Sequence, residues 1–455
     1  MKASILIVSL ALALLFSPVP AEAERVWLTT KAPYQAPEEG AALEDPPDGF
    51  RPLMVQHVAR HGSRGLSSSD DEDLLYQLWK YARDRGQLTE LGQQLGPELE
   101  TMIAVHARLG FGRISRLGEL EHEQQAQRLV ARLPELFQLT EDDRRVIRIT
   151  HSGRERAADS GVAFVNGLLE AAPQLAGRLQ PAEASPSTVY FHSAEGSEDF
   201  EAYRDNDPQL TAVMARLYAD PMTEAAYEGV LRALFTPDLI DALRAGELEF
   251  IARADEDERL NSIEDAVEAL YGLYTISTNL IHEADFDLGR FLPAQYLGWI
   301  AMIDDADSYY GRGPGFAGRD ITYRAADALF ADMLAQAMAD PPEVLASFRF
   351  THAQVMMPVA TWLRLEHAWP GTEPGRLFQY DTHAWRSAEI APMSANLQWE
   401  IWHNDQDQRL LRMLHNEAPV RFPAPCNRHL PDSDFYRLGE VRRCLQELHP
   451  TLTVP

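Results

Sequence analysis

The chain has 455 residues, 45% of them hydrophobic, and its formal net charge is −28 at pH 7. This composition is typical of a globular protein with a sizeable core, and the negative charge excludes nucleic acid and anionic membrane surfaces as general partners. It does not exclude a small anionic ligand, because salt screens charges beyond about 8 Å and a site is governed by its own residues.

The first predicted element is a secretion signal. The chain starts with Met1-Lys2, continues with an apolar run over 5–16, and reaches a small-x-small cleavage pattern at 21–23. The run is shorter than the roughly 20 apolar residues of a membrane helix, and no later stretch of the sequence reaches that length. We therefore expect residues 1–23 to be a signal peptide, and the protein to be exported to the periplasm or the extracellular space.

Buried strands followed by helices predict an α/β core. Short apolar runs at 52–58, 145–150 and 348–351 are typical of buried strands, and the second and third precede apolar residues at helical spacing. Such units favour a mainly parallel sheet covered by helices. Near the C-terminus, 397–402 and 410–414 predict two further short strands.

The region from about 195 to 340 has a different character. No strand signal interrupts its stretches of helical spacing, which are 222–247, 259–284, 294–310 and 319–339. We therefore expect an all-α domain, residues 191–340, inserted into an α/β core formed by residues 24–190 and 341–455. Residues 24–50, rich in Pro, Ala and Glu, are expected to be an extended lead-in.

The segment Arg60-His61-Gly62-Ser63-Arg64 follows the first predicted strand and is the first to suggest chemistry. Ligands of open α/β sheets bind at strand ends, and arginine forks match phosphate oxygens while staying charged. A neutral imidazole between them can attack phosphorus, and a glycine lets the backbone approach closely. The spacing alone leaves open a buried, salt-bridged strand end as the alternative.

The same segment resembles the Arg-His-Gly-x-Arg signature of the histidine phosphatase superfamily, in its larger branch of acid phosphatases and phytases. The resemblance implies a phosphoglycerate-mutase-like core. It also implies that His61 is the nucleophile, which forms a phosphohistidine, and that Arg60 and Arg64 bind the phosphate.

Further segments agree with this family in the expected order. Gln87 to Gly92 resembles its Leu-Thr-x-x-Gly helix start, in which Thr89 is also a sound N-cap. The stretch 152–156 resembles the element that supplies a third phosphate arginine, which implies Arg156 rather than Arg154. Thr351-His352-Ala353-Gln354 stands where the family places its second catalytic histidine, here His352.

Three stretches resemble one subgroup, the multiple inositol polyphosphate phosphatases. They are His-Ala in place of His-Asp at 352–353, Tyr-Tyr-Gly-Arg-Gly-Pro-Gly at 309–315, and Arg-Ser-Ala-Glu-Ile-Ala-Pro at 386–392 with 414–419 downstream. The resemblance covers about residues 50 to 445. It implies hydrolysis of small-molecule phosphate esters, inositol polyphosphates and phytate among them, without a metal or other cofactor.

Gln354 is the departure from this pattern that matters most. The subgroup usually has glutamate there, the proposed proton donor to the leaving alcohol, and a positioned general acid is worth about 10²–10⁴ in rate. Three outcomes are open: another acid substitutes, the enzyme is slow on alkyl phosphates, or the protein binds inositol phosphates without turnover. The candidates for a substitute acid are Asp304, Asp305 and Glu366.

A second departure, Gly65-Leu66-Ser67 in place of the usual aromatic-Pro-Thr, bears on how outer phosphates are held. A broad-specificity acid phosphatase would share the same site, and this function also stays open.

Other polar residues have structural interpretations. His57 and His151 lie on or beside strands and are expected in or near the core, with contact to the substrate as the alternative. Tyr309 and Tyr310 are expected to pack rather than to bind a ligand. His122 and Glu123 lack a second histidine four positions on from His122, so no zinc-hydrolase helix is present. Cys426 and Cys444 predict a disulfide in an oxidising compartment, with two buried thiols as the alternative.

Overall fold

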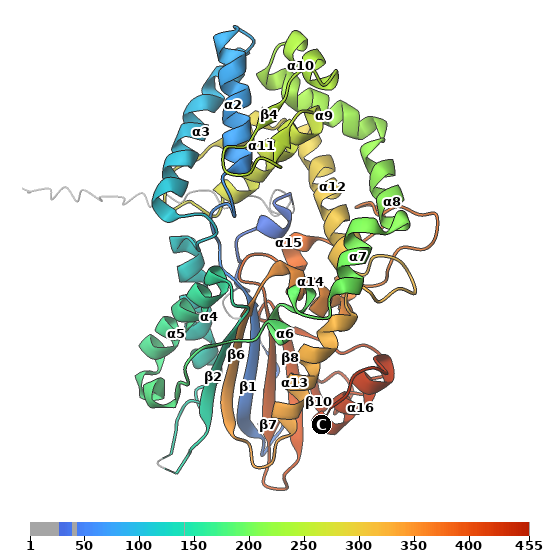
Figure 1. The fold of residues 1–455 in the computed structure, drawn as a ribbon. Helices are drawn as coiled ribbons and strands as arrows, with labels where there is room; N and C mark the ends of the chain where they lie inside the picture. Colours follow the sequence, from blue (N-terminus) through green and yellow to red (C-terminus); the bar gives the residue numbers. More distant parts are fainter. Residues whose placement is uncertain (1–26, 39–42, 141, 455) are drawn as a thin grey trace, which may run out of the picture.

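The computed structural model describes residues 27–38, 43–140 and 142–454, so the expected signal peptide at 1–23 lies outside the described residues. The strands of the main sheet are β1 (Arg51–Arg60), β2 (Val146–His151), β3 (Glu183–Ala184), β6 (Val344–Thr351), β7 (Asn396–His403), β8 (Arg409–His415), β9 (Ala418–Val420) and β10 (Phe435–Arg437). Their order is β10-β8-β7-β1-β6-β2-β3, with β9 paired to β8 (Figure 1).

The centre of this sheet is parallel. Strand β6 runs parallel to both β1 and β2, and β3 runs parallel to β2, whereas β7, β8 and β10 extend the other side of the sheet in antiparallel pairing. The α/β prediction with a mainly parallel core is therefore confirmed. The apolar runs of the sequence correspond to β1, β2, β6, β7 and β8.

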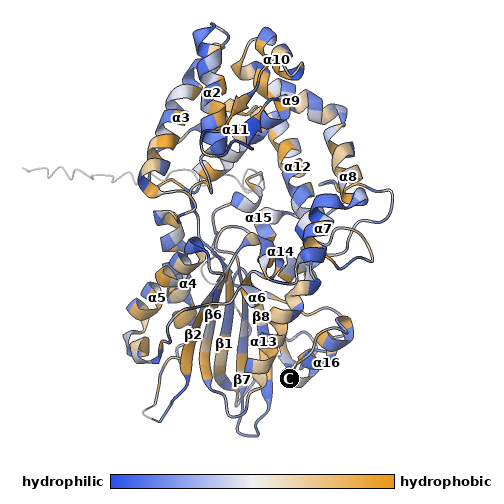
Figure 2. Ribbon diagram, viewed as in Figure 1, coloured by the Kyte–Doolittle hydropathy of each residue, from blue (hydrophilic) through white to orange (hydrophobic). Residues whose placement is uncertain are grey.

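Helices cover both faces of the sheet. Val55 and Ala59 of β1 face a core shared with α4 (Arg116–Arg132) and α5 (Glu155–Ala171). Met54 and Val58 face the opposite core, which is shared with α13 (Asp327–Met338), α14 (Ala353–Trp362) and α16 (Leu438–Leu448). Hydrophobic colour runs along these strands in Figure 2, as expected for a sheet that is buried on both faces.

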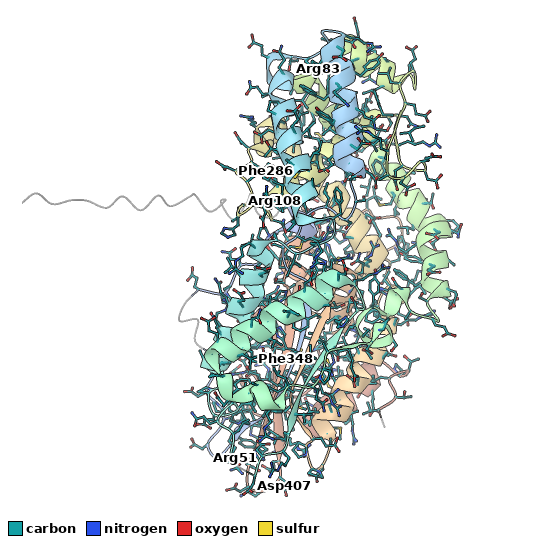
Figure 3. The ribbon with its side chains drawn as sticks, turned by 60° about the vertical axis from the view of Figure 1, so that its left-hand side comes forward. Arg51, Arg83, Arg108, Phe286, Phe348 and Asp407 are labelled. Carbon is teal, nitrogen blue, oxygen red and sulfur yellow. A yellow bond between two sulfur atoms is a disulfide. The ribbon has the colours of Figure 1, made fainter. Side chains whose placement is uncertain are left out.

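Aromatic packing fixes α5 on the sheet. Helix α5 lies across the strands over Phe348 in Figure 3, and the ring of Phe348 lies 4.7 Å from that of Phe164 on α5. The same ring of Phe164 lies 5.0 Å from the imidazole of His57, which places His57 in the core as expected.

A second hydrophobic core is mainly helical and lies at the top of Figure 1. Its helices are α2 (Asp70–Asp84), α3 (Glu90–Leu109), α9 (Pro221–Leu234), α10 (Pro237–Arg244), α11 (Ile263–Ser277) and the start of α12 (Ala294–Arg312). Helices α2 and α3 precede residue 191 yet pack here, whereas α13 packs on the sheet. The division into 24–190, 191–340 and 341–455 stays a prediction.

Two local expectations for this region differ from the structure. The stretch 222–247 is divided into α9 and α10, because Pro237 lacks an N–H and disfavours helical backbone at the residue before it. A small hairpin of β4 (Phe250–Ile251) and β5 (Arg259–Leu260) interrupts the helices. Each of its strands has two residues, too few to produce an alternating signal.

The remaining helical elements are short and connect the larger ones. They are α6 (Pro186–Val189), α7 (Glu198–Asn206), α8 (Pro208–Tyr218), α15 (Ser387–Ile390), and the 3-10 turns η1 (Thr29–Lys31), η2 (Pro173–Arg178), η3 (Phe191–Ser193), η4 (Leu288–Phe291), η5 (Arg324–Ala326) and η6 (Glu366–Ala368). Cys426 and Cys444 form the predicted disulfide, with Cα atoms 5.1 Å apart. Over the described ranges, no helix combines the length and apolar character needed to span a bilayer.

The segment around η1 lies between the helical core and the sheet (Figure 1). The hydroxyl of Tyr271 on α11 donates to the Trp27 carbonyl at 2.6 Å, and the hydroxyl of Thr29 donates to Asp304 on α12 at 2.6 Å. On the sheet side, the Met393 N–H donates to the Ala32 carbonyl at 2.8 Å. The expected lead-in is thus, in this part, a connection between the two halves of the molecule.

Candidate active site

The predicted site residues meet at the carboxyl edge of the parallel strands. Arg60 at the end of β1 is paired with Thr351 of β6, and His151 at the end of β2 is paired with Phe350. Because parallel strands end at the same edge, the segments that follow them converge there. The rings of His61 and His352 are 5.3 Å apart, and Arg156 Nε lies 3.3 Å from His352 Nδ1.

His61 is held as a neutral ring in one tautomer. Its Nδ1 lies 3.0 Å from the Gly62 carbonyl oxygen, which can only accept, so Nδ1 carries the proton and Nε2 keeps a free lone pair. The side chain is buried, and burial together with Arg60, His352 and further arginines lowers the pKa of His61 well below 6.5. A neutral imidazole of this kind is a competent nucleophile.

Close backbone packing fixes the loop that carries His61. A Cβ added at Gly62 would lie 2.6 Å from the carbonyl oxygen of Gly118 on α4, so only glycine fits there. The Gly62 N–H donates to the Ser160 hydroxyl of α5 at 3.0 Å. Helices α4 and α5 therefore hold the loop from the side opposite the strand.

The buried carboxylate of Glu121 on α4 connects this loop with two other segments. It accepts from the Ser63 N–H at 2.8 Å and from the Ser63 hydroxyl at 2.8 Å. It also accepts from the Ser394 hydroxyl at 2.7 Å and from the Tyr34 N–H at 2.9 Å. Glu121 is therefore placed to position the loop rather than to contact a substrate.

Three arginines surround His61 without carboxylate partners. The Arg60 guanidinium donates to the carbonyls of Thr30 and Ala391, and that of Arg64 donates to the Gly65 carbonyl at 2.6 Å. Neither these two nor Arg156 forms an ion pair with a described residue, and the buried Nε–H groups of Arg60 and Arg64 have no partner among those residues. Burial and neighbouring Arg156 lower the pKa of Arg64 to about 10, so it stays charged at neutral pH.

His352 is the N-cap residue of α14. The Arg156 Nε–H donates to its Nδ1, so the ring proton of neutral His352 lies on Nε2, which is 2.7 Å from the Ser152 hydroxyl. Burial, and after it the positive charge of Arg156, lowers the pKa of His352 to about 2. The N-termini of α14 and α5 both follow strands that end at this edge, and helix N-termini favour anions.

Gln354 lies in the first turn of α14, two residues after His352, and its side chain is half-buried. Its backbone carbonyl accepts from His192 Nδ1 at 3.2 Å, and its side-chain amide makes no hydrogen bond with the residues that the structure describes. The structure thus brings Gln354 into the same segment as His352 but gives the amide no partner.

The candidate substitute acids have separate surroundings. Asp305 is buried and accepts from the Tyr380 hydroxyl at 2.7 Å and from Ser387, and burial raises its pKa to about 7. Glu366 lines a cavity with His415 and Arg421 to which none of the predicted site residues contributes. Asp304 is exposed and accepts from Thr29, the neighbour of Thr30, whose carbonyl accepts from Arg60. Asp305 adjoins the other segment that contacts Arg60, because its partner Ser387 begins the short helix that ends before Ala391.

Several other candidates have the structural roles expected for them. Tyr309 and Tyr310 are fully buried and pack against Phe378 and Phe316. Thr89 caps α3 by accepting from the Gly92 N–H. Arg154 is exposed, with its guanidinium 5.7 Å from the centre of the Tyr190 ring. In the described part of the chain, no three His, Cys, Asp or Glu side chains gather as metal ligands would.

Sequence reasoning missed Lys31, the last residue of η1. Its side chain is half-buried, and its ammonium lies 3.4 Å from the Thr30 hydroxyl. Burial, opposed by Asp304 and reinforced by Arg64 and Arg60, lowers its pKa to about 8. One signal was available in the sequence, because lysine stands only at positions 2, 31 and 80.

Comparison with solved structures identifies similar proteins over most of the chain. The multiple inositol polyphosphate phosphatase of Bifidobacterium longum, in complex with inositol hexasulfate, has a TM-score of 0.87 and 25% identity, covering 93% of this chain and 98% of that one. The same protein in complex with phosphate has a TM-score of 0.88 and 26% identity over the same shares. The phytase from D. castellii shares the fold, with a TM-score of 0.67 and 15% identity over 93% of this chain and 85% of that one.

A search of curated proteins gives no match to the chain. The model of the histidine phosphatase superfamily (branch 2) matches residues 53–416, a range that contains both the His61 and the His352 segments. The chain therefore belongs to branch 2 of the histidine phosphatase superfamily.

Proposed function

We propose that this phosphatase is an exported phosphomonoesterase that hydrolyses inositol polyphosphates, phytate included, through a phosphohistidine on His61. The observation that carries the proposal is a cluster of positive charge without ion pairs to described residues, in a chain whose net charge is −28. Arg60, Arg64 and Arg156 surround a neutral histidine and lack ion pairs with described residues. Buried cations of this kind are costly unless an anion binds between them.

The reaction has two steps. In the first, Nε2 of His61 attacks the phosphorus in line, an N–P bond forms, and the O–P bond to the alcohol breaks. Arg60, Arg64, Arg156 and His352 stabilise the charge on the equatorial oxygens. In the second, water attacks the phosphorus, the N–P bond breaks, and inorganic phosphate leaves with His61 neutral again.

The departing alcohol needs a proton, and Gln354 cannot donate one. The nitrophenolate released from p-nitrophenyl phosphate is a stable anion and does not need this donor, whereas the alkoxide released from an inositol phosphate does. The donor is therefore unassigned; Asp304 and Asp305 are the candidates whose partners lie in the segments that contact Arg60. The inositol substrate class is supported by the similarity to the Bifidobacterium longum phosphatase, whose structure contains inositol hexasulfate.

The decisive experiment measures phosphate release from inositol hexakisphosphate by the wild type and by His61→Ala. The expected result is release by the wild type, none by His61→Ala, and unchanged release by His151→Ala, a matched control at the end of β2. Acid-labile phosphate on the trapped enzyme should depend on His61. Release by His61→Ala at the wild-type rate would refute the proposal.

The same assay separates the alternatives. A non-catalytic inositol-phosphate binder would bind the compound tightly and release no phosphate from it. A broad-specificity acid phosphatase would hydrolyse sugar phosphates as efficiently as inositol hexakisphosphate. N-terminal sequencing of protein recovered outside the cytoplasm tests export, with a start after residue 23 expected.

A further inference from the structure

A lysine lies beside the phosphate arginines and is not part of the motifs that define the site. Lys31 belongs to η1, whose residue Thr30 accepts a hydrogen bond from Arg60 through its carbonyl. The backbone of Lys31 is fixed as well, because the side chain of Asn279, two residues after the end of α11, donates to its carbonyl at 2.8 Å. The lysine is thus held between the helical core and the end of β1.

The ammonium of Lys31 has an unusual electrostatic position. Its strongest charged neighbours are Asp304, which attracts it, and then Arg64 and Arg60, which repel it; Asp71 on α2 is a weaker attraction. Neither carboxylate forms an ion pair with Lys31, and its contact is the Thr30 hydroxyl at 3.4 Å. A half-buried cation placed next to two other cations is costly unless an anion joins them.

The phosphate that His61 attacks already has Arg60, Arg64, Arg156 and His352 as its ligands in the proposed mechanism. An ammonium adjoining Arg60 and Arg64 is then available for a second anionic group. Lysine is a compact point charge with three donors and binds phosphate oxygens without a fixed geometry. A substrate with a neighbouring phosphate would supply the missing anion.

We propose that Lys31 binds a second phosphate of the substrate, adjacent to the one being removed, and so selects polyphosphorylated substrates over monophosphates. This inference rests on the proposed function. It assigns to the segment before β1 a direct part in substrate choice. In this proposal the residues around His61 carry out the reaction, and Lys31 of η1 makes the contact that distinguishes polyphosphorylated substrates from monophosphates.

Kinetics of Lys31→Met test the proposal. Inositol hexakisphosphate has the second phosphate and p-nitrophenyl phosphate lacks it, so kcat/KM should fall about tenfold for the first and less than twofold for the second. Most of the loss should be in KM, and Lys31→Arg should restore much of it. Lys80→Met changes the other described lysine, which packs over Tyr76 on α2, and should leave both substrates unaffected.

Equal losses on both substrates, or no loss on either, would overturn the proposal. Equal losses would mean that Lys31 supports the fold or the shared phosphate site, and no loss would mean that it does not contact the substrate. The melting temperature of Lys31→Met separates unfolding from lost binding. The backbone hydrogen bonds of η1 do not depend on the lysine side chain, so the variant is expected to fold.

A labelling experiment tests the same contact in the wild type without catalysis. Reductive methylation near pH 8, followed by peptide mass spectrometry, reports Lys31 and Lys80 separately. Inositol hexasulfate should protect Lys31 several-fold more than inorganic sulfate does, and Lys80 not at all. Equal labelling of Lys31 with and without inositol hexasulfate would overturn the proposal. Protection without phosphate release from inositol hexakisphosphate would support the contact and refute the proposed function.

Discussion

Replacing Glu121 by glutamine tests how the loop around His61 is positioned. The two residues have the same shape, but the carboxylate accepts four hydrogen bonds and the amide accepts through one atom only. Oε2 accepts from the Ser63 N–H and the Ser394 hydroxyl, and Oε1 accepts from the Ser63 hydroxyl and the Tyr34 N–H. A hydroxyl can turn and accept from the new NH₂ group, but a backbone N–H cannot.

Glutamine therefore leaves one buried N–H without an acceptor in either orientation, that of Ser63 or that of Tyr34. An unsatisfied buried donor costs about 1–3 kcal/mol, and we expect the free energy of unfolding to fall by that amount. In the orientation that leaves the Ser63 N–H without an acceptor, displacement of Ser63 moves the neighbouring His61 out of line. A shift of about 1 Å at a reacting group costs as much as 10²-fold, so kcat should fall at least tenfold.

The assay combines urea unfolding with the steady-state hydrolysis of p-nitrophenyl phosphate. Glu119→Gln is the matched control, because Glu119 lies on the same helix in an exposed pair with Arg116, and such pairs contribute about 1 kcal/mol or less. A destabilised Glu121→Gln enzyme with the wild-type kcat would show that Glu121 supports the fold but does not position His61. Stability equal to that of Glu119→Gln would refute the hydrogen-bond reasoning itself.

Further predictions concern the acid, the close packing and the pH dependence. Gln354→Glu should raise kcat on inositol hexakisphosphate by about 10²-fold relative to p-nitrophenyl phosphate, and equal effects on both would contradict the missing-acid explanation. Gly62→Ala should abolish phosphate release and lower the melting temperature, because its Cβ would meet the Gly118 carbonyl oxygen at 2.6 Å. Since burial lowers the pKa of His61 well below 6.5, its protonated form is disfavoured and the nucleophile stays neutral as the pH falls through 6.5. The rate on p-nitrophenyl phosphate should then show no titration near pH 6.5, and a tenfold fall for each pH unit below that value would refute this assignment.

Local patterns predicted the sheet well because its strands are continuous apolar runs. On β1, Val55 and Ala59 face one core, and Met54 and Val58 face the core on the other side of the sheet. Because both faces are covered, the strand appears in the sequence as a run of apolar residues. Helices α2 and α3 were not assigned to the helical core, since amphipathic spacing shows that a helix is buried on one face but not what covers it. The break between α9 and α10 has a local signal in the sequence, because Pro237 disfavours helical backbone at the residue before it.

The candidate site was predictable where a motif carries it and not elsewhere. The segments of His61 and His352 match family signatures, so their meeting at one edge follows from parallel strands. Lys31 and Glu121 depend on contacts between segments that are distant in the chain, such as the bond from Thr29 to Asp304 across 275 positions. The spacing of residue types along the sequence does not predict such contacts.

The segment around η1 also bears on when during folding the enzyme becomes active. Its partners include Asp304, which lies 275 positions after Thr29. The Arg60 side chain contacts both this segment and Ala391, which lies 331 positions after Arg60. Contacts between such distant segments form late, because the entropy of closing the intervening loops is lost before they are gained. A chain in which His61 has been synthesised thus lacks the complete phosphate site until His352 and the residues near 391 have followed. Activity appearing after the sheet has formed, measured by refolding with a fluorescent substrate, is the kinetic signature of that delay.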